Sequence, residues 1–307
     1  MFRKDNENEK RTKVHLGMNT KKVSPTPKGV GISSPKEMIK MQIELEVNTF
    51  RELIEEIAVK GKYNSGDTCK NGQVSNYAVL KVEGDYLVAY NADNINIAVI
   101  RLRLEEGQLF RSGRTVIDIE KTVKYLKGFT GIVTLEFRDY LTIKNDSSIA
   151  RVPLVEEHPT PNMISRGEVF HKTLRSMGEG MPTFGKTEYK TEVVISEDEM
   201  LSASKSCDVV GLARYKFDYD EDEESLIMSS RKSITDKFDV PDSALDKIFD
   251  VIIETTMSEA EDATVEFNGQ VSKFLKGTVR LYINDDAPVL FVTPTRMLLK
   301  APYIGNR

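Results

Sequence analysis

The chain is poor in the residues on which metal sites and many catalytic sites depend. It contains no tryptophan, two cysteines and three histidines in 307 residues. His15, His158 and His171 have no second ligand at a spacing typical of zinc sites. Cys69 and Cys207 lie far apart in sequence, and neither has a neighbouring base that would make it a nucleophile. The sequence therefore predicts no disulfide framework, no metal and no catalytic residue.

Long apolar runs and phosphate-binding loops are also missing. No stretch approaches the roughly 18 apolar residues that a membrane helix needs, and the polar N-terminus lacks the apolar core of a signal peptide. The pair Gly29 and Gly31 lies in a proline-rich region and not at a strand-to-helix turn, so a nucleotide-binding loop is not indicated. We expect no enzymatic activity, no cofactor and no membrane association, in a reducing compartment.

Acidic residues outnumber basic ones, but the two signs are unevenly spread. The formal net charge is −5, whereas residues 1–40 contain ten Lys or Arg against four Asp or Glu, which leaves −11 on the remainder. A nucleic-acid surface on the body of the protein would therefore have to be a local basic patch. Residues 1–40 are expected to be a flexible tail, either without function or acting as a phosphate-binding arm.

Apolar periodicity predicts the same order of elements twice along the chain. In the first unit, one helix is expected to begin at an Asn48 or Thr49 cap and to end at Gly61. A second helix is expected to begin after an Asp118 cap and to end at Gly128. Strands are expected at 41–47, 76–82, 86–91, 95–104, 115–117, 132–137, 140–144 and 148–155.

The second unit follows a break in this pattern, because residues 156–188 hold three prolines and four glycines and are expected to form a long linker. Helices are then predicted at Glu197–Val210 and, after an Asn268 cap, at Gln270–Lys276. Strands are predicted at 191–195, 212–219, 225–230, 248–256, 263–267, 278–283, 289–293 and 297–304.

The predicted fold class is therefore α+β, with two topologically similar domains that each carry two helices on antiparallel sheets. The predicted boundaries are a tail at 1–40, domain 1 at 41–155, a linker at 156–188 and domain 2 at 189–307.

Segments of both units resemble the proliferating cell nuclear antigen family of DNA polymerase sliding clamps, in its archaeal or viral type. Asn91–Leu104 is similar to the family's strand after an alanine-methionine-aspartate turn, and Thr115–Lys127 is similar to its second helix. Arg151–Leu154 resembles the archaeal form of the last strand of domain 1. Glu188 and Tyr189 stand where the family's linker enters domain 2.

The C-terminal part carries the sharpest resemblance. Asp286–Phe291, followed by Leu298–Ile304, is similar to the closing strands of the family, which end in leucine-alanine-proline-x-isoleucine. Lys300 departs from this pattern, since the family has a leucine before alanine-proline. The resemblance covers about residues 41–307 apart from the linker, and it implies the DNA clamp fold.

What the resemblance implies is a homotrimeric ring that encircles double-stranded DNA without reading its sequence. Such a ring tethers a DNA polymerase and other clamp-binding proteins at a cytoplasmic, nuclear or viral replication site, and an ATP-driven clamp loader opens it. The DNA-facing candidates are the basic residues of the four expected helices: Arg51, Lys60, Lys62, Lys121, Lys124, Lys127, Lys205, Lys273 and Lys276. The other interpretation of these residues is a set of solvated helix faces.

The resemblance also implies a pocket for client proteins beneath the linker. Its walls would be Asn96, Ile97, Val99, Tyr189, Leu299, Ala301, Pro302 and Ile304, unless these residues belong to an ordinary core. Four linker residues are candidates for its lid: Met163, Ile164, Val169 and Phe170. Two strand edges, 148–155 and 248–256, would pair between subunits, because apolar edges favour a partner. The subunit-interface candidates are Ile149, Arg151, Val152, Val251 and Ile253.

The main alternative is an adaptor with the clamp fold, monomeric or part of a hetero-ring, that recruits replication or transcription proteins without encircling DNA. Pairing of the two strand edges between subunits would favour the ring. A hydrolase or nuclease would need clustered carboxylates or histidines. The acidic run Asp218–Glu224 is more typical of a solvated hairpin tip than of a cation site.

Overall fold

The structure is a computed structural model of the chain. It describes residues 39–59, 76–93, 95–155, 168, 170, 181–209, 214–231, 249–269 and 271–303. Apart from Ile39 and Lys40, the expected N-terminal tail lies outside the described residues, as do the three histidines and Cys69.

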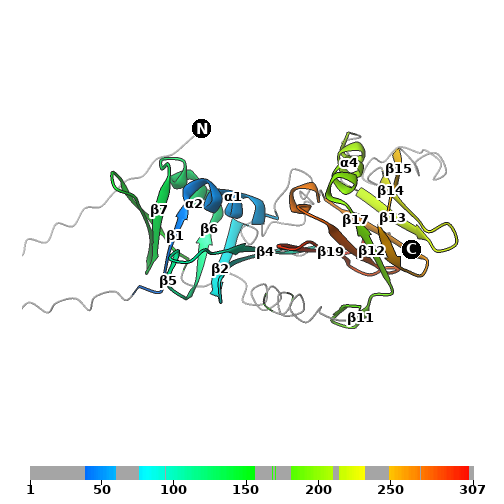
Figure 1. The fold of residues 1–307 in the computed structure, drawn as a ribbon, viewed down its shortest axis with the longest axis horizontal. Coiled ribbons are helices and arrows are strands. Elements are labelled where there is room, and N and C mark those ends of the chain that lie inside the picture. Colours follow the sequence, from blue (N-terminus) through cyan, green and yellow to red (C-terminus); the bar gives the residue numbers. More distant parts are fainter. Residues whose placement is uncertain are drawn as a thin grey trace, which may run out of the picture. The chain divides into compact units, whose positions relative to one another are not determined.

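The first repeat has the order of elements that the sequence predicts, with one additional strand, β5. Its two helices contact each other and lie over the strands of this repeat (Figure 1). The elements are β1 (Met41–Glu46), α1 (Val47–Ile57), β2 (Tyr77–Glu83), β3 (Tyr86–Ala92), β4 (Asn96–Arg103), β5 (Leu109–Arg111), β6 (Arg114–Asp118), α2 (Ile119–Leu126), β7 (Ile132–Phe137), β8 (Tyr140–Lys144) and β9 (Ile149–Pro153).

The second repeat follows the same order after a short hairpin that belongs to the expected linker, β10 (Thr183–Phe184) and β11 (Thr187–Glu188). The further elements are β12 (Thr191–Ile195), α4 (Glu197–Asp208), β13 (Arg214–Asp220), β14 (Ser225–Arg231), β15 (Phe249–Ile253), β16 (Met257–Glu259), β17 (Ala263–Asn268), the 3₁₀ turn η2 (Ser272–Phe274), β18 (Val279–Ile283), β19 (Val289–Val292) and β20 (Arg296–Lys300).

One large sheet joins the two repeats. Its nine strands have the order β16-β12-β18-β19-β20-β4-β3-β2-β6. The joint is the antiparallel pair of β20 and β4, in which Leu298 is opposite Ala98 and Leu299 is opposite Ile97. Each repeat also has a sheet of its own, β5-β1-β7-β8-β9 in the first and β15-β14-β13-β17 in the second.

The large sheet buries apolar side chains on both faces. Because successive residues of a strand point to opposite faces, Ala98 and Ile100 belong to the cluster that includes the buried residues of the helices, whereas Ile97 and Val99 belong to a second cluster on the other face. We call these the helix-side core and the outer-face cluster. The alternation explains why β4 reads as a nearly continuous apolar strand.

The helix caps are partly as expected. Asp118 caps α2 as predicted, since its carboxylate accepts a hydrogen bond from the backbone N–H of Lys121 at 3.0 Å. The prediction of Asn48 or Thr49 as the cap of α1 is wrong. Glu46 takes this role and accepts from the backbone N–H of Thr49 at 2.9 Å, and the helix ends at Ile57.

The predicted helix Gln270–Lys276 is also wrong, because the structure has only the 3₁₀ turn η2 here. Two glycines in the left-handed region, Gly269 and Gly277 with φ of 85° and 87°, bracket the segment and leave room for a single turn. The cap of η2 is Val271, without a side-chain hydrogen bond, and not Asn268.

Two predicted strands end at least three residues earlier than expected. The strand expected at 248–256 ends at Ile253, and the next residues form β16, which pairs with β12 in the large sheet. The last strand ends at Lys300, since Pro302 has no N–H for the ladder. Pro302 instead forms a bridge with Phe267, and the N–H of Tyr303 donates to Glu266 O at 2.6 Å.

A partly buried ion-pair cluster ties α1 to the closing strand of the other repeat. The Glu56 carboxylate accepts hydrogen bonds from Arg296, whose side chain is 6% exposed, and from Lys276. We expect Glu56→Gln to lower the free energy of unfolding by about 2 kcal/mol, because it removes the charge that a buried guanidinium faces. Urea unfolding checks this, with Glu55→Gln at the exposed neighbouring position as the control, for which less than about 0.5 kcal/mol is expected.

Candidate functional site

The lysines expected to face DNA lie on the helix side of the protein. Lys124 and Lys127 are exposed at the C-terminal end of α2, and Lys205 is exposed in the last turn of α4. None of these three forms an ion pair with another described residue. They are exposed charges at helix ends where the dipole favours a cation.

The other DNA-facing candidates form ion pairs, are half-buried or lie outside the described residues. Lys121 is exposed but pairs with Asp118 at 3.2 Å, and Lys276 pairs with Glu56. Arg51 is half-buried on α1. Lys60 and Lys62 lie outside the described residues, as does the side chain of Lys273.

Four of the expected pocket residues come together in the outer-face cluster. Ile97 and Leu299 are opposite each other across the joint, and Val99 and Tyr189 belong to the same cluster. All four are buried, so the chain itself covers them. The hydroxyl of Tyr189 donates to Pro288 O at 2.7 Å, and burial raises the pKa of this phenol far above its ordinary value.

The remaining pocket candidates have different surroundings. Asn96 is buried in a polar chain in which its amide donates to both carboxylate oxygens of Asp93 at 3.0 Å and its Oδ1 accepts from Lys300 Nζ at 3.0 Å. Lys300 also donates to Asn268 O at 3.0 Å, which explains how a buried lysine replaces an apolar residue at this position. Ala301 and Pro302 are half-buried, and Ile304 lies outside the described residues.

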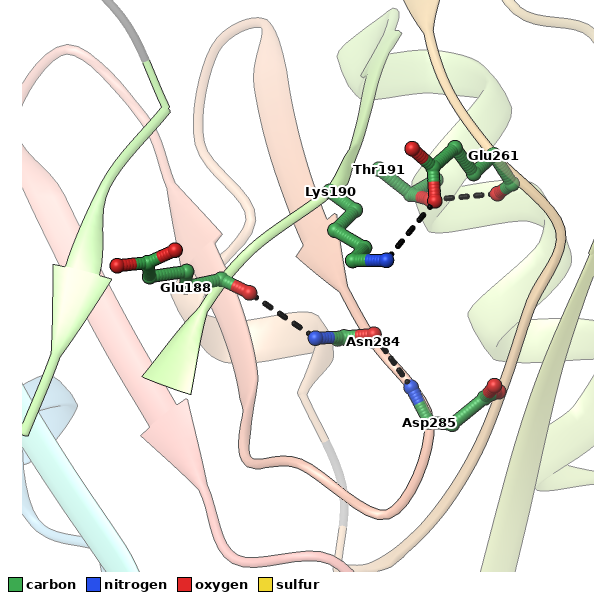
Figure 2. A network of polar contacts seen from close by, with 6 residues as sticks. All are labelled: Glu188, Lys190, Thr191, Glu261, Asn284 and Asp285. Carbon is green, nitrogen blue, oxygen red and sulfur yellow. Dashed lines mark hydrogen bonds and ion pairs between the residues drawn. The ribbon is translucent and has the colours of Figure 1, made fainter. Parts of the chain in front are cut away.

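A network of side-chain to backbone hydrogen bonds fixes the end of the linker on the second repeat (Figure 2). Asn284 Nδ2 donates to Glu188 O at 3.0 Å, and the Thr191 hydroxyl donates to Glu261 O at 2.6 Å. Lys190 adds an exposed ion pair with Glu261 at 3.1 Å. The hairpin β10–β11 is therefore held at its exit, next to Tyr189.

The three larger sheets of the described residues end in six strands, and β9 and β15 are two of them. β9 ends the sheet of the first repeat, and β15 ends the sheet of the second. Ile149 on β9 is 69% exposed, and Ile252 on β15 is 70% exposed. Exposed apolar side chains on unpaired edges are unusual, because such edges promote association.

The other interface candidates differ in orientation. Arg151 is exposed, but Val152 and Ile253 are buried in the helix-side core, and Val251 is half-buried against it. Sequence reasoning missed Phe249, which is 43% exposed on β15, and Tyr125, which is 44% exposed on α2. Phe249 lies within the strand that the sequence predicts at 248–256, where its aromatic side chain was the available signal.

A groove of about 750 Å³ runs beside the β9 edge, between this strand and α2. Its apolar wall consists of Tyr125, Phe129, Ile149 and Ala150. Lys124 lies at its border with Lys121, so the groove is apolar inside and basic at the rim.

The described residues contain no group of three or more His, Cys, Asp or Glu that could hold a metal ion. Burial raises the pKa of the Cys207 thiol to about 11, so it stays protonated at neutral pH. The acidic run forms the tip of the β13–β14 hairpin, with its turn exposed, as predicted. No helix in the described part of the chain is long and apolar enough to cross a membrane.

The fold is that of DNA sliding clamps. The DNA polymerase sliding clamp of Bacillus subtilis is similar at a TM-score of 0.62 with 16% identity, over 90% of this chain and 68% of that chain. The A. fulgidus PCNA, solved with the C-terminal region of FEN-1, is similar at 0.57 with 12% identity, over 87% of this chain and 100% of that chain.

A third clamp structure adds a different bound peptide. The Helicobacter pylori beta clamp, solved with a DNA ligase peptide, gives a TM-score of 0.57 with 11% identity, over 87% of this chain and 68% of that chain. No protein-family model and no curated protein matches the sequence. The expectation of an α+β clamp fold is thus confirmed.

Proposed function

We propose that this chain is the subunit of a DNA sliding clamp: a non-enzymatic processivity factor that forms a homotrimeric ring around duplex DNA. The ring holds a DNA polymerase and other clamp-binding proteins near the template, an effective-concentration effect. It needs an ATP-driven loader to open it on DNA and acts wherever that DNA is replicated, in the cytoplasm or the nucleus.

One observation carries this proposal. The last strand of the second repeat, β20, pairs with the fourth strand of the first repeat, β4. The corresponding strands of the opposite repeats, β9 and β15, both end a sheet and have no partner strand on their outer side among the described residues. A head-to-tail contact between β9 of one copy and β15 of the next would repeat the joint that already exists within the chain. Repeating one head-to-tail contact gives a closed ring when the rotations between successive copies add up to a full turn.

The joint also predicts the register of that contact. When the two repeats are aligned strand by strand through their hydrogen-bond registers, Ala150 corresponds to Leu298, and Phe249 corresponds to Ala98. Since Leu298 is opposite Ala98, Phe249 of one copy would lie opposite Ala150 of the next. Its ring would then enter the groove beside β9, which Ala150 lines.

The same register places Ile149 opposite Asp250 of the neighbouring copy. We expect Ile149→Glu to weaken the contact between copies about 10-fold more than Ile149→Lys does, because like charges directly opposite each other destabilise a strand pair and opposite charges stabilise it. Both variants lose the same apolar contact, so Ile149→Lys serves as the control. Sedimentation equilibrium checks the prediction, and equal dissociation constants would exclude this register.

The distribution of exposed lysines supports a ring whose helices face the DNA. The exposed lysines of α2 and α4 lie on the helix side, whereas the outer face carries the apolar cluster and the linker hairpin. Lysine contacts with phosphates give an attraction that does not depend on sequence and that weakens with salt. The match to A. fulgidus PCNA covers 100% of that chain and 87% of this one, which is in line with the archaeal or viral type.

The mass in solution tests the proposal. Light scattering across a dilution series should give a stable species near three times 34.7 kDa. A monomer at every concentration would contradict the homotrimer and favour the adaptor function, in which the same outer face recruits proteins without a closed ring.

A further inference from the structure

One side chain of the expected linker is buried as deeply as any core residue. Phe170 has no exposed surface and belongs to the outer-face cluster together with Ile97, Val99 and Leu299. The last three are residues that the sequence analysis assigned to the partner pocket. An aromatic side chain of the linker therefore belongs to the same cluster as the proposed partner site.

The end of the linker supplies a second aromatic ring. Phe184 of the β10–β11 hairpin packs edge-on against Phe170, with 5.7 Å between ring centroids. Met181 and Phe184 are only partly buried against the outer-face cluster, whereas Tyr189 is fully enclosed by it. We call Glu168, Phe170, Met181 and Phe184 the strap.

The strap is attached to the first repeat by a contact that is easy to break. Arg114 at the start of β6 forms an ion pair with Glu168 at 3.1 Å, and the two side chains are 41% and 31% exposed. An ion pair with this exposure contributes little to stability, because water and salt screen both charges. Two contacts therefore hold this part of the strap: the burial of Phe170 in the outer-face cluster, and the weak, screened ion pair between Arg114 and Glu168.

We infer that the strap is an internal ligand of the outer-face cluster, in which Phe170 and Phe184 occupy the place that the aromatic anchors of a partner peptide would take. This inference rests on the proposed function. A partner of this kind is a short segment with two apolar or aromatic side chains, and it binds by displacing the strap. Its apparent affinity is then reduced by the fraction of molecules in which the strap is seated.

A single tryptophan tests whether the strap can be released. The chain has no tryptophan, so Phe170→Trp introduces one fluorescent reporter at this position. The indole is expected to resist acrylamide quenching in the full-length protein. Adding Arg114→Glu is expected to raise the quenching constant about 2- to 5-fold, and adding Glu168→Arg as well is expected to restore it, because the ion pair is then reversed.

The matched control breaks an exposed ion pair elsewhere. Lys40→Glu removes the contact with Asp139 at 3.2 Å and is expected to leave the quenching of Trp at position 170 unchanged. If Arg114→Glu also leaves the quenching unchanged, Phe170 is a fixed core residue and the inference is overturned.

Partner competition is measured with a labelled peptide of the C-terminal region of FEN-1, the segment bound to A. fulgidus PCNA. We expect Phe170→Ala to bind this peptide at least about 10-fold more tightly than the parent, because the internal occupant is gone. Phe184→Ala, at a half-buried position, is expected to act in the same direction with a smaller effect, and it serves if Phe170→Ala does not fold.

Weaker or equal binding by both variants would overturn the competition, since Phe170 would then be a wall of the site. If no protein binds the peptide while the quenching responds to Arg114→Glu, the strap is releasable as inferred. That result would count against the proposed partner site, so the two failures can be told apart.

Discussion

Phe249→Asp is expected to convert the protein to monomers. In the proposed ring, Phe249 of one copy enters the apolar groove between α2 and β9 of the next, where Phe129 and Ala150 form the wall. Loss of the phenyl ring removes about 1–2 kcal/mol of apolar burial at each interface. An aspartate at this position must also lose water against the apolar wall of the groove, which adds about 2 kcal/mol or more. Together these terms weaken each contact about 100-fold or more.

Light scattering and sedimentation equilibrium measure this effect directly. Phe249→Leu is the control, because it keeps an apolar side chain of sufficient length and is expected to retain the assembly with less than about a 10-fold change. Phe249 is partly exposed on an edge strand, so both variants are expected to fold, and circular dichroism confirms that. A trimer that survives Phe249→Asp unchanged would exclude the proposed contact.

The alternation of apolar and polar residues, which gives the same order of elements twice, made most of this fold predictable from the sequence. The strands 132–137, 140–144 and 191–195 appear where the alternation of apolar residues places them. Elements of three residues or fewer were missed, such as β5 and the hairpin β10–β11, because so few residues do not establish a period. The prediction of a helix at Gln270–Lys276 was wrong because the pattern of apolar residues does not show that Gly269 and Gly277 adopt left-handed conformations. These two glycines limit the segment between them to a single turn.

The candidate surfaces were predictable only where the family resemblance supplied them. It grouped Ile97, Val99, Tyr189 and Leu299, which the structure also brings together. It named Phe170 only as one of four candidates for the lid, because the linker has no clear period and could not be aligned, and the structure buries this residue in the same cluster. Nor did it show that Val152 and Ile253 point into the core. The direction of these side chains depends on which face of each strand is covered by the rest of the repeat, and the sequence does not specify that.

Charge reversal of two helix lysines is expected to abolish most of the affinity for DNA. Lys127 and Lys205 are exposed on α2 and α4 and do not line the groove at the β9 edge. In a ring of three copies, Lys127→Glu with Lys205→Glu reverses six charges that face the hole. Because each phosphate contact contributes about 0.9 to the slope of log affinity against log salt concentration, we expect the slope to fall by several units. The affinity at low salt is expected to fall about 100-fold or more.

The control carries the same charge change on the other side of the protein. Lys186→Glu with Lys190→Glu alters two exposed lysines at the linker hairpin and is expected to change DNA affinity less than about 5-fold, because screening limits exposed charges to about 10 Å. Fluorescence anisotropy with a short linear duplex, onto which a closed ring can thread over a free end, measures both variants over a salt series. Light scattering checks that the ring persists. Equal losses in the two double variants would mean that DNA is attracted by overall charge, and the helix-lined hole would have to be abandoned.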